Sequence, residues 1–156
     1  MFENNDVDIL NGLLGNFCQQ LFDDSLNFCA NIKLFKVAGG AGHNVEIIVK
    51  KALRQPVSLG NYRNVQVEEV MKEVQSCLEY RGDYGSHPGL EFLDSKKSSE
   101  MKTQILELLD KLVSESKQII GFYFKEGHPF YPVFWDFAFV IEHEIDSYVL
   151  IGSSSD

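Results

Sequence analysis

The last third of the chain constrains the fold most strongly. It contains three runs of aromatic and β-branched residues, separated by short polar segments, at residues 119–124, 133–141 and 148–151. Such runs, bounded by turn-forming residues, predict three consecutive antiparallel strands. The middle run is largely apolar on both of its alternating faces, so we expect it to be a central strand that is covered on both sides.

Helical periodicity dominates the earlier part of the chain. Apolar residues recur at intervals of three and four over residues 6–24, 67–78 and 98–117, which predicts three amphipathic helices. The second helix is expected to follow Asn64 as its N-cap and to stop at Gly82. With 156 residues and twelve Phe, the chain is long enough to bury a core without disulfides. We therefore predict a single α+β domain over residues 1–156, in which a C-terminal three-stranded meander dominates an antiparallel sheet packed by three or four helices.

Three shorter segments are less sharply patterned. Residues 44–54 have helical spacing after Asn44, a suitable N-cap, but they also fit a strand that pairs with the one expected at residues 32–37. Residues 56–64 contain Pro and Gly and are expected to form a loop. Residues 90–93 are expected to be a short strand or a tether packed on the core.

The charge of the chain indicates which partners it favours. Twenty-three acidic residues against fourteen basic ones give a net charge of −9, which repels phosphate backbones and anionic membranes and attracts basic proteins. We expect neither nucleic acid nor a membrane as partner. Residues 1–6 show no secretory signal, and the three cysteines form no Cys-x-x-Cys pair, so we expect a cytoplasmic protein without a metal or other cofactor.

Asp136 is the residue most suggestive of catalysis, because it interrupts an apolar strand and a buried carboxylate needs donors, a cation or a proton. A pocket would form if His87, His128 and Asp136 converged with Tyr84 or Tyr131. The structural alternative is an Asp at the end of a sheet strand, with both histidines in turns. No catalytic motif links these residues.

Two further segments have a functional and a structural interpretation. The glycine-rich residues 39–42 precede a possible helix and would present backbone N–H groups to an anion, although the phosphate-binding fingerprint is incomplete and a plain connection fits as well. The hydroxyl-rich residues 153–156 are expected to be a mobile chain end.

Acidic side chains concentrate in two places, one on the helix expected at residues 67–78 and one in the turn after residue 141. They are Glu68, Glu69 and Glu73, and Glu142, Glu144 and Asp146. Like charges on one surface steer the encounter with a cationic protein. We therefore expect these two acidic groups to contact a partner.

The single acidic domain, with a Phe-Trp-Asp-Phe-Ala-Phe strand and an Ile-Gly-Ser-Ser-Ser-Asp end, resembles the small immunity proteins of bacterial polymorphic toxin and contact-dependent inhibition systems. The resemblance implies a stoichiometric inhibitor that covers the active site of a cognate toxin, often a basic nuclease. The competing hypotheses are a small enzyme or ligand-binding protein that uses the pocket described above, and a homodimer that buries an apolar patch against its own copy.

Overall fold

The computed structural model describes all 156 residues as five helices and one five-stranded antiparallel sheet. The α+β class is as predicted. The helices are α1 (Asn4–Asp23), α2 (Val45–Leu53), α3 (Val67–Leu78), α4 (Leu90–Leu93) and α5 (Lys96–Ser114), and the strands are β1 (Cys29–Val37), β2 (Leu59–Asn64), β3 (Gln118–Phe124), β4 (Trp135–Glu142) and β5 (Ser147–Ser155). The order across the sheet is β1-β5-β4-β3-β2.

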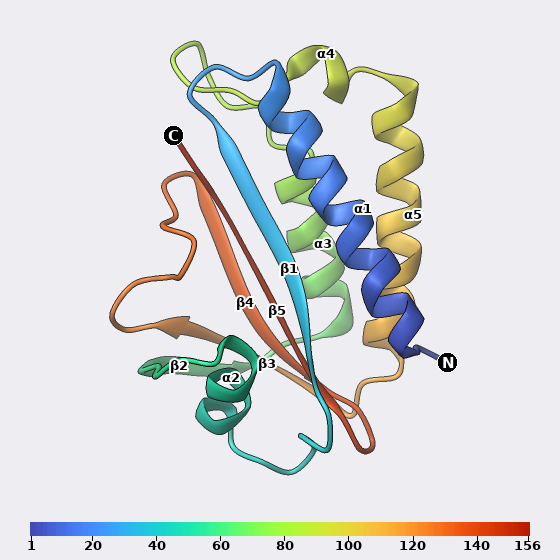
Figure 1. Cartoon of the computed structure of the whole chain (residues 1–156), viewed down its shortest axis with the longest axis vertical. Helices are drawn as coiled ribbons and strands as arrows, with labels where there is room; N and C mark the ends of the chain where they lie inside the picture. The colour runs from blue at the N-terminus through green and yellow to red at the C-terminus, as the bar shows by residue number, and fades with distance from the viewer.

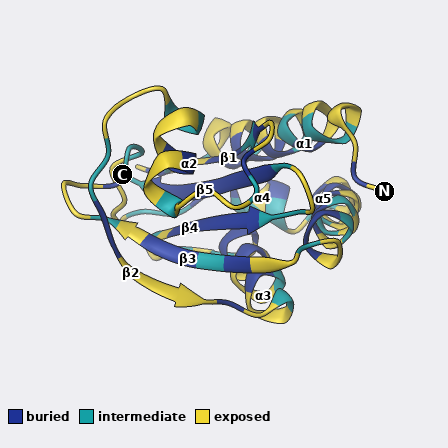
Figure 2. Cartoon of the chain, turned by 90° about the horizontal axis from the view of Figure 1, so that it is seen from below, coloured by how far each residue is buried: buried dark blue, intermediate teal, exposed yellow.

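Helices cover both faces of this sheet. The helices α1, α3 and α5 lie along one face, and α2 lies on the other (Figures 1 and 2). The larger apolar cluster, which includes Leu14, Ile105 and Ile141, fills the space between the sheet and the three helices. The smaller cluster, which includes Ile48 and Val149, lies beneath α2. Burial on both faces explains why the central strands consist almost entirely of apolar residues.

The meander of β3, β4 and β5 confirms the three predicted C-terminal strands, and β4 is the central strand of the sheet. The expectation of a mobile end at residues 153–156 was wrong for most of that segment. Ser153 and Ser154 are buried, because β5 continues between β1 and β4 almost to the end of the chain. The Ser153 hydroxyl also donates a hydrogen bond to Phe130 O at 3.0 Å.

The three less sharply patterned segments form two helices and a strand. Residues 45–53 form a helix, and Asn44 caps it by accepting a hydrogen bond from the Ile47 N–H at 2.9 Å. The predicted loop at residues 56–64 was wrong, because residues 59–64 form the edge strand β2. This strand lacks the alternation of apolar and polar residues that would predict it, because most of its residues are polar and it contains a bulge. Residues 90–93 form the short helix α4 and not a strand.

At the opposite edge of the sheet, α1 protects the exposed side of β1. The side-chain amide of Asn11 donates to Leu34 O and its oxygen accepts from the Leu34 N–H, both at 2.8 Å. The side chain therefore takes the place of a neighbouring strand at one position of the free edge. Unpaired edges invite pairing with other chains, and this contact blocks that pairing.

Replacing Asn11 with Ala is expected to lower the free energy of unfolding by about 1–3 kcal/mol, because the substitution leaves a half-buried N–H and C=O without partners. Urea denaturation of the two proteins measures the difference. Gln19→Ala is the control, since the Gln19 amide bonds only to Asp23 on the exposed side of the same helix. An Asn11 variant as stable as the Gln19 variant would contradict the protective role.

Candidate functional site

The acidic turn between β4 and β5 is bound to the glycine-rich loop of the same chain. Glu142 Oε2 accepts from the Gly42 N–H at 3.1 Å, and Asp146 Oδ1 accepts from the Gly39 N–H at 2.9 Å. The Gly40 and Ala41 N–H groups donate to backbone carbonyls, so all four N–H groups that the sequence offered to an anion are satisfied within the protein. The hydrogen bond from Gly39, and next the charge of Lys36, hold the pKa of Asp146 below its usual range.

This arrangement changes the expected role of the turn. Glu142 and Asp146 hold two segments together, whereas Glu144, with 85% of its side chain exposed, makes only an ion pair with Lys117 at 4.0 Å. Substitutions at Glu142 and Asp146 will therefore disturb the loop as well as any interface. Glu144 is therefore the carboxylate of this turn that a partner would engage at the lowest cost, because its ion pair with Lys117 is long and exposed to solvent.

The acidic group on α3 is exposed. Glu68 and Glu69 lie in the first turn of the helix, where their charge complements the helix dipole. Glu69 also forms an ion pair with Arg63 on β2. Glu73 lies one turn further along, is exposed, and forms no ion pair. Glu68 also forms no ion pair, so Glu68 and Glu73 are the residues of this group that are free for an external cation.

Glu73 faces a cleft where the sheet divides. The strands β3 and β4 are paired only at the ends far from the loop that joins them, from Gln118 and Glu142 as far as Gly121 and Phe139. Beyond these residues β4 continues beside β5, while β3 turns away together with β2 (Figure 1). We call the resulting opening the fork cleft. It is a cavity of about 520 Å³ lined by Asn61, Arg63, Glu73, Phe122, Tyr123, Asp136, Phe137, Ala138 and Phe139.

Asp136 lies in this cleft and is exposed, which corrects the expectation of a carboxylate buried in an apolar strand. It is the second residue of β4, at the point where β3 has already separated, so solvent reaches its side chain. The charges of Glu73 and Asp136 both act on the buried Cys77 thiol, whose pKa is raised to about 12 mainly by burial. The two residues therefore line the same cleft, Asp136 from β4 and Glu73 from α3.

His128 is buried beside the fork cleft and serves a structural role. Its Nε2 donates to Phe137 O at 3.3 Å, and its Nδ1 accepts from the Phe130 N–H at 3.1 Å. Because Nδ1 must accept, the ring is neutral with its proton on Nε2. Burial lowers the pKa of His128, and the bond to Phe137 and the charge of Asp136 oppose this shift. Neither nitrogen is free to act as a catalytic base.

The lowered pKa of His128 predicts acid sensitivity. An unfolded His takes up a proton near pH 6.5, whereas the folded one resists, so the unfolded state binds more protons below that pH. Stability should fall as the pH drops below 6.5, by up to about 1.4 kcal/mol per pH unit, until the folded His titrates. Urea denaturation at several pH values measures this. The amide of the variant His128→Asn does not titrate, so its free energy of unfolding should depend less steeply on pH below 6.5. Equal slopes for the two proteins would contradict a lowered pKa of His128.

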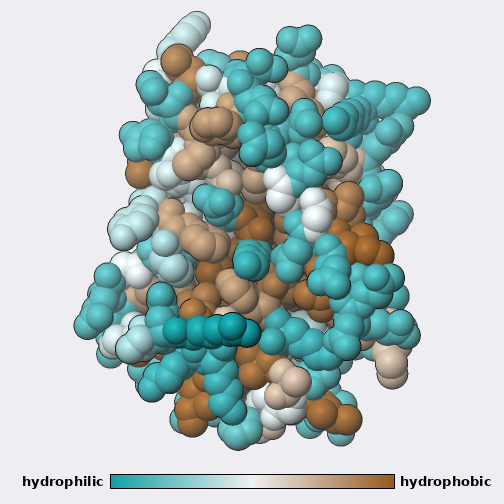
Figure 3. Space-filling model, in the orientation of Figure 1, coloured by the Kyte–Doolittle hydropathy of each residue, from teal (hydrophilic) through white to brown (hydrophobic).

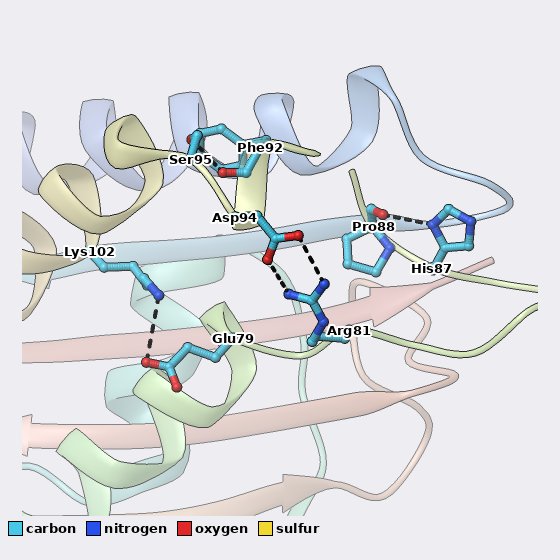
Figure 4. Close-up of polar contacts among 8 residues, drawn as sticks. All are labelled: Glu79, Arg81, His87, Pro88, Phe92, Asp94, Ser95 and Lys102. Carbon is cyan, nitrogen blue, oxygen red and sulfur yellow. Dashed lines mark hydrogen bonds and ion pairs between the residues drawn. The ribbon is translucent and has the colours of Figure 1, made fainter. Parts of the chain in front are cut away.

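His87 lies elsewhere, in the loop between α3 and α4 (Figure 4). Its backbone pairs with Leu26, and its Nδ1 is 2.8 Å from Pro88 O. The depression that His87 lines contains Arg81 and Tyr84 but not Asp136, and the fork cleft does not contain His87. The structure therefore does not bring together the residues of the catalytic hypothesis.

The two tyrosines of that hypothesis are also separate from the fork cleft. Tyr84 and Tyr131 project into solvent, with 101% and 83% exposure. Neither lines the fork cleft. Tyr123 does line it, although sequence reasoning overlooked this residue because it lies within an apolar run.

The surface around these features is predominantly polar. Figure 3 shows hydrophilic side chains over most of the face in view, with hydrophobic ones visible between them near the middle of the molecule. No group of three or more His, Cys, Asp or Glu side chains is placed to hold a metal ion. No helix combines the length and apolar character needed to cross a bilayer.

No family model matches this sequence, and no curated protein is significantly similar to it. The strongest candidate site is the fork cleft, because it combines a concave shape, aromatic walls and two free carboxylates.

Proposed function

We propose that this protein is a stoichiometric inhibitor that binds a basic protein toxin, in the manner of an immunity protein. The observation that carries the proposal is the fork cleft, which Glu73 and Asp136 both line without an ion-pair partner of their own. Paired free carboxylates in a concave site attract cationic groups and raise the association rate. The net charge of −9 adds long-range attraction for a basic surface.

The geometry gives less support to the enzyme hypothesis. A general base needs a free nitrogen or oxygen within reach of a substrate. His128 has both nitrogens bonded to the backbone, and His87 lines a different depression from Asp136. A binding surface needs only exposed groups of suitable charge and shape, and the fork cleft supplies both.

The proposal is tested by co-expression with the C-terminal domain of the protein encoded directly upstream, which is where the toxin of an immunity protein is expected. We expect the two to copurify as a one-to-one complex and the growth of the host to be restored. A toxin that remains lethal and does not copurify would refute the pairing. Recovery of this chain as a dimer of its own copies, without the toxin, would favour the homodimer instead.

A further inference from the structure

The fork cleft contains backbone groups that lack a neighbouring strand. The Val65 N–H donates to Ile119 O at 2.9 Å and the Lys125 N–H to Ser58 O at 2.8 Å, so odd-numbered residues of β3 face β2. Alternate residues of an antiparallel strand face opposite neighbours, and even-numbered residues of β3 therefore face β4. Pairing between β3 and β4 ends at Gly121 and Phe139.

The same alternation applies to β4. Ile120 lies opposite Val140 in the ladder, so the even-numbered residues of β4 face β3. Next along β4 come Ala138 and Asp136, and β3 no longer lies beside Asp136. The backbone N–H and C=O of Asp136, a residue that lines the cleft, are thus turned toward the opening. A segment bound in the cleft therefore meets both the polar backbone and the negative charge of Asp136.

A guanidinium group of the chain itself already lies at the edge of the cleft. Arg63 forms its ion pair with Glu69, and its Cζ lies 3.4 Å from the position that a Cβ on Gly121 would occupy. The absence of a side chain at Gly121 leaves room for this flat group. Glu73 and Asp136, which also line the cleft, have no such internal partner. The cleft therefore has the chemistry to hold a second guanidinium.

We propose that the fork cleft receives an arginine side chain carried on an extended segment of the basic partner. The segment lies along the free edge of β4 at Asp136 and exchanges backbone hydrogen bonds with it, as an added strand does. The guanidinium lies between the carboxylates of Glu73 and Asp136, and the aliphatic part of the side chain packs on the rings of Tyr123 and Phe139. This inference rests on the proposed function, because it names the part of the partner that is bound.

The test uses short peptides, so that it does not depend on the identity of the partner. The ¹⁵N-labelled full chain is titrated with acetyl-Thr-Val-Arg-Val-Thr-amide, and in parallel with the same peptide carrying citrulline, which has the shape of arginine without its charge. We expect the arginine peptide to shift the amide signals of residues 122–124 and 136–138. Its affinity should exceed that of the citrulline peptide by about fivefold or more.

The double variant Glu73→Gln/Asp136→Asn should lose that preference, and its circular dichroism should match the unaltered chain because both residues are exposed. Equal binding of the two peptides, or shifts confined to other acidic sites such as the turn around Glu144, would overturn the inference. Selective binding at the cleft without copurification of the upstream toxin would uphold the inference and refute the proposed toxin pairing. Copurification without selective peptide binding would uphold the toxin pairing and refute the inference about the cleft.

Discussion

Gly152→Ala is expected to lower the free energy of unfolding by about 1–3 kcal/mol, although it adds only one methyl group. Gly152 lies on β5 directly opposite Phe137 of β4. A Cβ at this position would lie 2.5 Å from Phe137 Cζ and 3.1 Å from Ile32 Cγ1. The ring covers the glycine and stacks with Trp135 and Phe139 on either side, so it cannot move without disturbing its neighbours.

A double-mutant cycle identifies the cause of this loss. Phe137→Leu removes the clashing ring atoms, so the double variant Gly152→Ala/Phe137→Leu should be more stable than the sum of the two single effects predicts, by about 1 kcal/mol or more. Gly12→Ala is the control, because Gly12 is exposed in α1 and an added Cβ there meets nothing within 4 Å. It should stabilise the chain by up to about 1 kcal/mol. Additive losses would refute the contact between Phe137 and Gly152.

Reversing the charge of both free carboxylates in the fork cleft is expected to have the largest effect on partner binding. Glu73→Lys/Asp136→Lys places two cations where the proposed partner brings its own, so attraction becomes repulsion. We expect the affinity for the upstream toxin to fall by about a hundredfold or more, which corresponds to about 2.8 kcal/mol. Association measured by surface plasmon resonance should also become slower and less dependent on salt.

The control for this variant changes the net charge equally on another part of the surface. Glu107→Lys/Asp110→Lys alters two exposed acidic residues of α5. It should slow association only modestly, because just the long-range attraction is reduced. If both double variants lost the same affinity, net charge and not the fork cleft would determine binding.

The sequence predicted the elements whose side chains are buried in a regular pattern. The strands β3 and β4 and the long helices follow from apolar periodicity, because burial imposes the period of the secondary structure. The end of β5 was missed, since Ser153 and Ser154 are small and polar yet buried between two strands. The edge strand β2 was missed because its residues from Asn61 to Asn64 are exposed and polar.

The candidate site was harder to predict, because it depends on contacts between distant segments. Glu142 and Gly42 are 100 residues apart, and nothing in either segment shows that the acidic turn binds the glycine-rich loop. Asp136 and Glu73 were each singled out from the sequence, but for different hypotheses. They line one cleft because β3 and β4 separate after Gly121, and this divergence leaves no mark on the hydrophobic pattern of either strand.

Hydrogen exchange of the complex tests the central claim most directly. The chain is analysed by mass spectrometry alone and with the purified upstream toxin domain, and the change in exchange is mapped along the sequence. We expect binding to slow exchange in residues 122–124 and 136–138, at the fork cleft, and around Glu73. Protection confined to the turn around Glu144 or to the exposed face of α5, with the cleft unchanged, would contradict the assignment of the fork cleft as the binding site.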